Sequence, residues 1–190
     1  IEFSKHSTKP VINALSDESH PCQILADLMT YQEQRGSIKG KKIAWIGDGC
    51  NVCQTYMQAA NIFDFSLSIA TPEGYEPSQS YVDKYQKNVE YFNKPLDACL
   101  NADIIVTDVW TSMGQESEQK ERELAFKGFQ VDEEMMSKAK SDVIFMHCLP
   151  AYRGKEVSAD VIDGKQSVVW DEAENRLHVQ KALLLYLIEN

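Results

Sequence analysis

Residues 42–61, KIAWIGDGCNVCQTYMQAAN, decide the fold class of this 190-residue chain. Four of the first five residues are apolar, a Gly-Asp-Gly turn follows them, and a helical pattern begins at Asn51. A continuous apolar run is typical of a parallel strand that is covered on both faces. The stretch therefore predicts a strand, a tight turn and a helix, the repeating unit of an α/β protein.

The same alternation of apolar runs and helical patterns continues along the chain. The predicted strands are residues 42–48, 65–71, 103–110, 142–148 and 167–170. The predicted helices between them are residues 51–61, 79–92 and 132–140. This order indicates a doubly wound, five-stranded, mostly parallel sheet with helices on both faces and right-handed crossovers, a Rossmann-like fold.

Two further helices flank the predicted sheet. Residues 21–34 begin with a proline, carry apolar residues on one side and are followed by Gly36, which predicts a helix with a defined start and end. The last helix, about residues 172–188, ends in ALLLYLI. A helix end that is apolar all round is normally buried on every side. We therefore expect something beyond this chain to cover its outer side.

The charge and the apolar pattern argue against two kinds of partner. The chain has 19 Lys and Arg against 29 Asp and Glu, a net charge of −10, so its surface repels nucleic acid and anionic lipid. No apolar run reaches the ~18 residues that span a bilayer. The chain starts with neither a methionine nor a signal-peptide core, which suggests a processed or shortened chain.

The cysteines indicate reduced thiols. Their number, five, is odd, and their density is below that of a disulfide scaffold, so we expect a cytoplasmic location. Cys50 and Cys53 form a C-x-x-C pair, but the second pair of a tetrahedral metal site is missing. The sequence therefore predicts no metal.

Unusual polar sequences follow the predicted strands. In chain order they are GDGCN, TPEGYEP, DVWTSMGQE, HCLPAYRG and DEAENR. Ligands of open α/β sheets bind beyond the carboxyl ends of the strands. The agreement between these positions predicts one binding site at that edge of the sheet.

An amino-acid site is indicated after the third predicted strand. Asp108 stands at the strand end, and Ser112 and Met113 offer a hydroxyl and backbone N–H groups in the loop that follows. A carboxylate with N–H donors nearby could hold the ammonium and carboxylate groups of an amino acid. The alternative is a solvated loop carboxylate beside a core residue, Trp110.

An anion site is indicated at the start of the helix at residues 21–34. His20 and Gln23 lie three residues apart, so both project from its first turn. Free N–H groups and the positive end of the helix dipole favour a phosphate or a developing oxyanion there. The alternative for His20 is a capping position. Arg176 could likewise offer five donors to an anion or form a surface ion pair.

Two more residues have both a functional and a structural interpretation. Cys148 ends a predicted strand beside His147, where a nearby cation would favour its thiolate; it could also be a small buried apolar group. Asn51 could be the N-cap of its helix. The two glycines before it form part of a dinucleotide fingerprint, but Val52 occupies the third glycine position, so NAD binding is a weakly supported alternative.

Five motifs, HPCQ, GDGCN, DVWTSMGQE, HCLPAYRG and EAENR, together resemble the ornithine carbamoyltransferases over nearly the whole chain. Two motifs distinguish this family best from its relatives: S-M-G after D-x-W, and H-C-L-P. The aspartate carbamoyltransferases share H-P-x-Q but differ in the later loops. The resemblance implies a fold of the aspartate/ornithine carbamoyltransferase type. It also implies transfer of a carbamoyl group from carbamoyl phosphate to the side-chain amine of L-ornithine, which gives L-citrulline and phosphate without a cofactor.

The resemblance implies that one group of residues binds carbamoyl phosphate. His20 and Gln23 would contact the carbamoyl moiety, and Arg176 would bind carbamoyl phosphate as well. Cys148 and Leu149 would lie between that substrate and the amine. His20 and Arg176 would also be catalytic, as donors to the oxyanion that forms during attack.

A second group would bind ornithine by the same resemblance, namely Asn51, Asp108, Ser112 and Met113. Cys148 and Asp108 would be catalytic by binding and orienting the amine. We expect this role for the thiol rather than that of a covalent nucleophile, because the amine can attack directly and phosphate is already a good leaving group.

One departure from the family concerns domain organisation. The family's phosphate-gripping S-x-R-T-R motif belongs to an N-terminal domain and does not occur in this sequence. We therefore expect residues 1–20 to be a remnant of the carbamoyl-phosphate domain and residues 21–36 to be an interdomain helix. Residues 37–171 would form the ornithine-binding α/β domain, and the helix at residues 172–190 would pack on the absent domain.

The chain alone is therefore expected to have little or no activity, whereas its full-length parent would be a trimer-based homo-oligomer. Three alternatives stay open. They are a carbamoyltransferase for a different amine, a nicotinamide-binding module, and a non-catalytic amino-acid-binding or interaction domain. The motifs are compatible with arginine biosynthesis and with arginine degradation.

Overall fold

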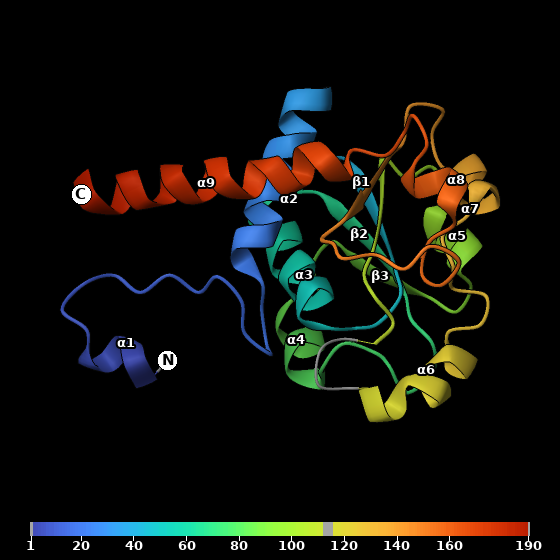
Figure 1. Ribbon diagram of the computed structural model, residues 1–190, viewed down its shortest axis with the longest axis horizontal. Helices are drawn as coiled ribbons and strands as arrows, with labels where there is room; N and C mark the ends of the chain where they lie inside the picture. The colour runs from blue at the N-terminus through green and yellow to red at the C-terminus, as the bar shows by residue number, and fades with distance from the viewer. Residues whose placement is uncertain (1, 112–115, 190) are drawn as a thin grey trace.

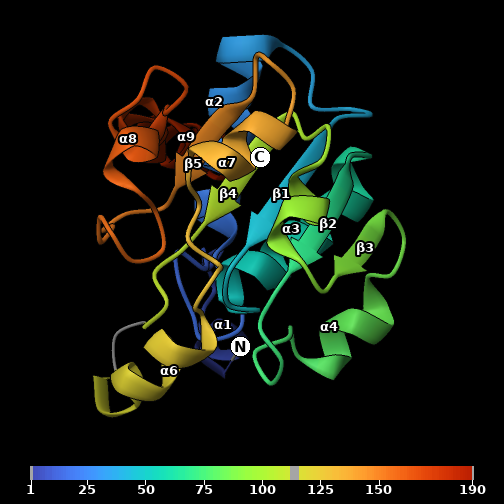
Figure 2. The same ribbon diagram turned by 90° about the vertical axis from the view of Figure 1, so that its right-hand side faces the viewer.

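A five-stranded parallel sheet forms the centre of the computed structural model, which describes residues 2–111 and 116–189 (Figures 1 and 2). The strands are β1 (Lys42–Ile46), β2 (Ser66–Ala70), β3 (Val89–Phe92), β4 (Ile104–Thr107) and β5 (Ile144–His147). Their order in the sheet is β3-β2-β1-β4-β5, and all four pairings are parallel. The predicted fold class is confirmed. The order reverses between β1 and β4, where doubly wound folds place their binding crevice.

Four of the five predicted strands are confirmed, and the fifth prediction, residues 167–170, is wrong. Within that stretch only Ser167 bridges to Phe145, and helix α9 (Val169–Glu189) starts two residues later. Val168 and Val169 are buried against the sheet as a helix start, and so short an apolar run does not distinguish a helix from a strand.

The remaining strand, β3, lies inside the predicted helix at residues 79–92. The helical part of that stretch, α4 (Gln79–Lys84), stops after six residues. β3 is an edge strand whose four residues are exposed or half-buried, so its sequence, VEYF, lacks the apolar run that marked the other strands. The sheet therefore has the predicted number of strands, but β3 takes the place of the strand predicted at residues 167–170.

Helices cover both faces of the sheet. One face packs against α2 (Pro21–Arg35) and α3 (Asn51–Phe63), and the prediction that both segments are helices is confirmed. The other face packs against α5 (Pro95–Cys99), α7 (Glu133–Lys138) and α8 (Ala159–Ile162). β1 shows the alternation, since Ile43 and Trp45 join the first core and Ala44 and Ile46 the second. The remaining short elements are α1 (Glu2–His6), the 3₁₀ helix η1 (Glu116–Glu118) and α6 (Gln119–Ala125).

The turn after β1 depends on a glycine. A Cβ on Gly49 would lie 2.2 Å from the backbone nitrogen of Pro77, and the Gly49 N–H donates to the Tyr75 carbonyl at 2.8 Å. No other residue fits there without moving the backbone of the loop after β2. This contact fixes the turn and places the start of α3 at the carboxyl edge of the sheet.

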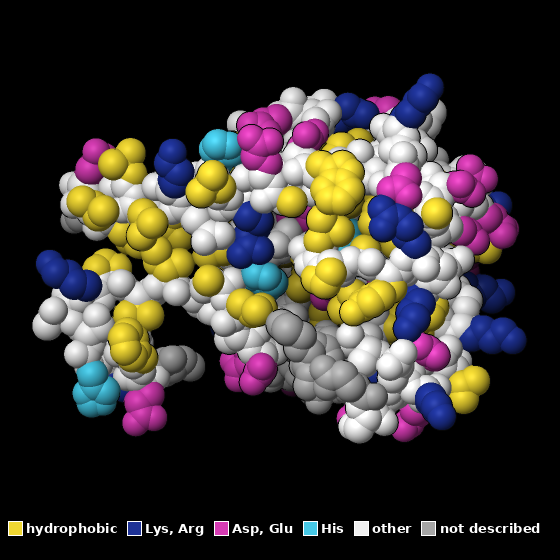
Figure 3. Space-filling view, viewed as in Figure 1, with side chains coloured by type: hydrophobic (Ala, Val, Ile, Leu, Met, Phe, Trp, Pro, Cys, Tyr) yellow, Lys and Arg dark blue, Asp and Glu magenta, His cyan; other side chains and the backbone are white. Residues whose placement is uncertain are grey.

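The C-terminal half of α9 extends away from the sheet (Figure 1). Leu184, Leu185 and Ile188 are 50, 56 and 80% exposed, and hydrophobic side chains gather along this part of the helix (Figure 3). The helix is longer than predicted at its start, at Val169, but its apolar end is as uncovered as the sequence suggested. Within residues 2–111 and 116–189, no helix has both the length and the apolar character needed to cross a bilayer.

Candidate functional site

Three strand ends bring two thiols and a carboxylate together. Asp108 follows β4, Cys148 follows β5, and Cys50 ends the turn after β1. The Cys148 thiol donates to Oδ1 of Asp108 at 3.1 Å, and the Cys50 thiol lies 3.7 Å from Oδ2. The backbone N–H of Val109 also donates to Oδ1, at 2.7 Å. The predicted pair of Asp108 and Cys148 therefore lies in direct contact, and Cys50 is an additional member that sequence reasoning missed.

The charged group beside Cys148 is an anion, whereas a thiolate would need a cation. Burial, and then the Asp108 carboxylate, raise the pKa of the Cys148 thiol well above its usual value. The same two causes raise the pKa of Cys50. Both sulfurs are therefore protonated at neutral pH and act as hydrogen-bond donors. The Asp108 carboxylate accepts from both thiols.

His20 interacts electrostatically with Asp108 and with Arg176, a member of a second group of site residues. It precedes α2, its backbone N–H donates to Oγ1 of Thr55 at 2.8 Å, and its ring nitrogen Nδ1 is buried without a hydrogen-bond partner among the described residues. Burial, followed by the positive charge of Arg176, lowers the pKa of His20, while the backbone of Ala14 and then the charge of Asp108 raise it to a smaller extent. The imidazole is therefore neutral at pH 7 and lies within electrostatic range of both Arg176 and Asp108.

Gln23 and Arg176 form the second group. Arg176 Nη1 donates to Oε1 of Gln23 at 2.6 Å, which joins the first turn of α2 to α9. The Gln23 amide nitrogen donates to Oδ1 of Asp27 and to Oε1 of Glu172, both at 2.8 Å. Nε of Arg176 is buried without a partner among the described residues, so the guanidinium retains a donor. Two predicted anion-binding residues are thus in contact.

Asp27 and Glu172 were not predicted from the sequence. Burial raises the pKa of Asp27 to about 6, against a hydrogen bond from the Tyr56 hydroxyl at 2.6 Å. Burial, and then the charge of Asp27, raise the pKa of Glu172 well above its usual value. The spacing of polar residues could have indicated these two acids. Gln23 and Asp27 are four residues apart on α2, and Glu172 and Arg176 are four residues apart on α9, so the members of each pair lie on one side of their helix.

The loop after β5 is built around the His147 ring. Its Nδ1 accepts from the N–H of Leu149 at 2.9 Å, and its Nε2 lies 3.4 Å from Oε1 of Glu156, which is also fully buried. Leu149 has a φ of +52°, a conformation that costs a non-glycine residue on the order of 1–3 kcal/mol. These contacts hold the turn and direct the Cys148 side chain to Asp108.

The predictions for Asn51 and for the loop after β4 have different outcomes. Asn51 is the first residue of α3 rather than its N-cap, which is Cys50. Its side chain accepts from the Val52 N–H at 2.9 Å and donates to the Ser16 carbonyl at 2.8 Å, so it ties the N-terminal segment to the site. Ser112 and Met113 lie outside the described residues.

A buried arginine anchors the segment that follows these two residues. Arg122 on α6 donates to Oδ2 of Asp48 in the turn after β1 and to the carbonyl oxygen of Trp110. Its guanidinium lies 4.7 Å from the centre of the Tyr75 ring and 5.5 Å from that of Phe126. Burial raises the pKa of Asp48 to about 6, although Arg122 opposes the shift. No sequence pattern predicts this contact, because it joins residues 74 positions apart.

One cluster has the residue types of a metal site. Ligand atoms of Asp108, His147 and Cys148 lie within 4.8 Å of one another. However, Nδ1 of His147 already accepts from Leu149, and the Cys148 thiol is a donor to Asp108. Because these hydrogen bonds use the atoms that a cation would need, we assign no metal ligands here.

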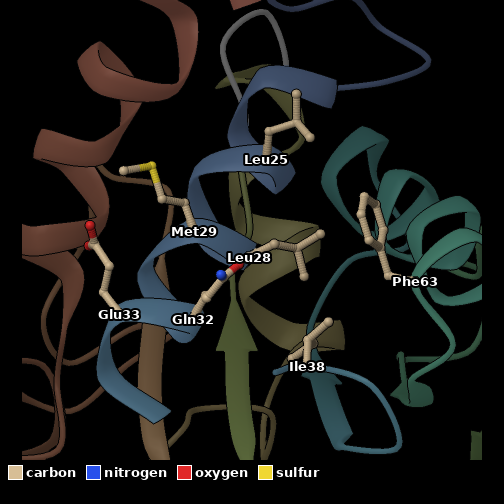
Figure 4. A pocket seen from close by; sticks show the side chains of 7 residues that line it. All are labelled: Leu25, Leu28, Met29, Gln32, Glu33, Ile38 and Phe63. Carbon is tan, nitrogen blue, oxygen red and sulfur yellow. The ribbon is translucent and has the colours of Figure 1, made fainter. Parts of the chain in front are cut away.

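An apolar pocket of about 540 Å³ lies elsewhere, on the outer side of α2 (Figure 4). It is lined by Leu25, Leu28, Met29, Gln32, Glu33, Ile38 and Phe63. Ile38 lies four residues before β1, and Phe63 ends α3 three residues before β2, so the pocket is on the side of the amino ends of these strands. It contains none of the predicted site residues and is separate from the site described above.

Two family models match the chain. Residues 39–187 match the model described as aspartate/ornithine carbamoyltransferase, Asp/Orn binding domain. Residues 1–33 match the model described as aspartate/ornithine carbamoyltransferase, carbamoyl-P binding domain. Together the two matches include the strand ends and most of helix α2, from which the site is built.

Individual proteins agree with these matches. A protein of Ruthia magnifica subsp. Calyptogena magnifica named ornithine carbamoyltransferase is 62% identical over 186 residues, which are 98% of this chain and 62% of that protein. The crystal structure of ornithine carbamoyltransferase from Burkholderia thailandensis is 53% identical with a TM-score of 0.90, covering 98% of this chain and 60% of that one. A structure of an N-acetyl-L-ornithine transcarbamylase is 29% identical with a TM-score of 0.83, covering 97% and 61%. The chain thus spans about three fifths of the length of these proteins.

Proposed function

The chain belongs to the aspartate/ornithine carbamoyltransferase family, and from this premise we propose that it is the ornithine-binding part of an ornithine carbamoyltransferase. The whole enzyme would transfer a carbamoyl group from carbamoyl phosphate to the side-chain amine of L-ornithine, giving L-citrulline and phosphate. The observation that carries this proposal is the contact of Cys148 with Asp108 at 3.1 Å, where adjacent parallel strands end. An acceptor for a cationic amine lies there, within electrostatic range of His20.

The amine must lose a proton before it can react. Its nitrogen forms a bond to the carbamoyl carbon, the bond from that carbon to the phosphate oxygen breaks, and one proton passes from the nitrogen to the departing phosphate. An alkyl amine has a pKa near ~10.4, so neutral amine at pH 7 costs about 4–5 kcal/mol. In this proposal Asp108 binds the amine and Cys148 orients it, while Asn51, Ser112 and Met113 hold the amino-acid end.

Attack creates negative charge on the carbamoyl oxygen. The neutral His20 ring and the free Nε–H of Arg176 are the donors that we propose for that oxygen. Each such donor is typically worth ~10²–10³ in rate. Gln23 and Leu149 would complete the contacts with carbamoyl phosphate, and Oε1 of Gln23 accepts from Arg176.

The domain boundaries are also part of this proposal. Residues 1–20 would end the carbamoyl-phosphate domain, residues 21–36 would connect the two domains, and residues 37–171 would bind ornithine. The helix at residues 172–190 would pack on the domain that precedes this chain, which is supported by the exposed apolar residues of α9. We further propose a cytoplasmic, trimer-based parent enzyme.

The test compares the full-length protein that contains this chain with the 190-residue chain itself. Citrulline formation is measured with carbamoyl phosphate and L-ornithine, and parallel assays replace ornithine with N-acetyl-L-ornithine, L-aspartate or putrescine. We expect the full-length protein to prefer L-ornithine and the 190-residue chain to give little or no product. A full-length protein that carbamoylates another of these amines preferentially would overturn the substrate assignment. Product from the chain alone would overturn the assignment of an incomplete site.

A further inference from the structure

The two carboxyl oxygens of Glu172 contact Gln23 and the end of β5 that precedes Cys148. Glu172 lies in the first turn of α9 and is 1% exposed. Its Oε1 accepts from the Gln23 amide at 2.8 Å, and its Oε2 accepts from the backbone N–H of His147 at 2.9 Å. Gln23 in turn holds Arg176, and His147 precedes Cys148. One carboxyl group therefore links the anion-binding pair with the strand end that presents the thiol.

The second carboxyl group, Asp27, fixes the orientation of the Gln23 amide. The amide nitrogen donates to both Asp27 and Glu172, so its oxygen must face Arg176. Turning the amide over would set its oxygen against two carboxyl oxygens, which is unfavourable in a buried site. Tyr56 holds Asp27 from the side of α3.

Burying two carboxyl groups next to each other is costly, and the neighbouring groups offset only part of that cost. The charged and titratable groups that face the pair are Arg176 on α9 and Tyr56 on α3, together with the backbone of His147 on β5. Burial raises the pKa of both acids, and the charge of Asp27 adds to the shift of Glu172. A hydrophobic contact between α2 and α9 would stabilise the fold without this cost, so the arrangement calls for a functional reason.

We propose that Glu172 is a positioning residue that holds the Gln23–Arg176 pair and the Cys148 strand end in register, so that carbamoyl phosphate and the amine meet at the correct geometry. This inference rests on the function proposed above and extends it, because it assigns a role to a residue that touches neither substrate. A misplacement of about 1 Å between reacting groups can cost ~10² in rate.

The test is the Glu172→Gln variant of the full-length protein, with Glu174→Gln as the matched control. Glutamine keeps the size of Glu172 but has one oxygen acceptor, so either the Gln23 or the His147 contact is lost. Glu174 lies on the same helix, is exposed and pairs only weakly with His178, at 3.6 Å. We expect Glu172→Gln to raise the KM values of both carbamoyl phosphate and ornithine and to lower kcat/KM by ~10–100-fold, from the loss of one buried hydrogen bond. The control should stay within ~2-fold of the unchanged protein.

Two further measurements separate positioning from folding. Glu172→Ala, which removes both contacts, should be slower than Glu172→Gln, and circular dichroism should show both variants folded at the assay temperature. Normal KM values for both substrates in Glu172→Gln would overturn the inference. Failure of both variants to fold would overturn it as well, because Glu172 would then be needed for the fold itself. If the unchanged full-length protein makes no citrulline, the proposed function fails, and that result is distinct from an active parent whose Glu172→Gln variant matches the control.

Discussion

Replacing Asp108 by asparagine should make Cys148 react faster with an alkylating reagent. The Cys148 sulfur lies 3.1 Å from Oδ1 of Asp108, and the negative charge of Asp108 is the second cause, after burial, of the raised thiol pKa. Two unit charges at that distance repel by about 5 kcal/mol at an effective dielectric constant of ~20. Asparagine removes this repulsion and still offers an oxygen to the thiol.

The expected size of the effect follows from two opposing terms. A change of about 5 kcal/mol raises the thiolate fraction by up to ~10⁴, since each ~1.4 kcal/mol is a factor of ten. A thiolate of lower pKa is a weaker nucleophile, with a Brønsted slope of about 0.4–0.5, and this removes nearly half of the logarithmic gain. The net expectation is alkylation of Cys148 about 10²-fold faster in Asp108→Asn than in the unchanged chain.

The assay needs only the 190-residue chain. It is treated with iodoacetamide at pH 8, samples are stopped over time, and mass spectrometry of the peptide that contains Cys148 gives the rate. Asp83→Asn is the matched control, because Asp83 is an exposed aspartate on α4 that accepts from Gln79 on the same helix. Circular dichroism verifies that each variant is folded. An unchanged or slower rate in Asp108→Asn would refute the electrostatic account of this site.

Three other changes test the buried charges and the second thiol. An acid whose pKa is higher in the folded than in the unfolded state stabilises the fold at low pH. The contribution of Asp27, on the order of 2–3 kcal/mol, should therefore be lost as the pH rises from 3.8 through about 6. Asp27→Asn should flatten this part of the plot of unfolding free energy against pH, measured by urea denaturation. Arg122→Ala leaves the buried Asp48 without its cation and should reduce the free energy of unfolding by about 3–5 kcal/mol, measured by urea denaturation. Cys50→Ala removes one donor to Asp108 and should raise the ornithine KM of the full-length protein by about 2–10-fold in the citrulline assay.

Matched controls exist for the last two changes. Lys120→Ala alters an exposed residue of α6 and should leave the free energy of unfolding within ~0.5 kcal/mol. Cys99→Ala alters a thiol in the core on the other face of the sheet and should leave the ornithine KM unchanged. Equal effects of Arg122→Ala and Lys120→Ala, or of the two cysteine changes, would contradict the roles assigned to Arg122 and Cys50.

The part of the site that could be predicted follows from a geometric rule. Asp108 and Cys148 end neighbouring apolar runs, and parallel strands bring their carboxyl ends to one edge, so sequence order alone places them near each other. The same reasoning failed for residues 167–170 and 89–92, because a buried helix start can be as apolar as a strand and an edge strand can be as polar as a helix. Local pattern does not contain the information about which face is covered.

This rule does not predict the buried polar residues that hold the site together. Glu172 and Gln23 are 149 residues apart, and their contact exists because α2 and α9 pack together. Arg122 meets Asp48 in the same way, through the packing of α6 on the turn after β1. A charged residue that is paired and buried has the same letter in the sequence as one that is solvated. Only the packing of distant elements makes the distinction.

The close approach at Gly49 explains why the first turn of this fold has two glycines of a nucleotide-binding sequence. In dinucleotide-binding proteins the second glycine clears the way for a pyrophosphate group. Here the chain's own Pro77 backbone takes up the room that the missing side chain leaves, 2.2 Å from where a Cβ would stand. The glycine therefore accommodates protein where its nucleotide-binding counterparts accommodate a cofactor. The turn after β1 and the loop after β2 are therefore locked together at this glycine.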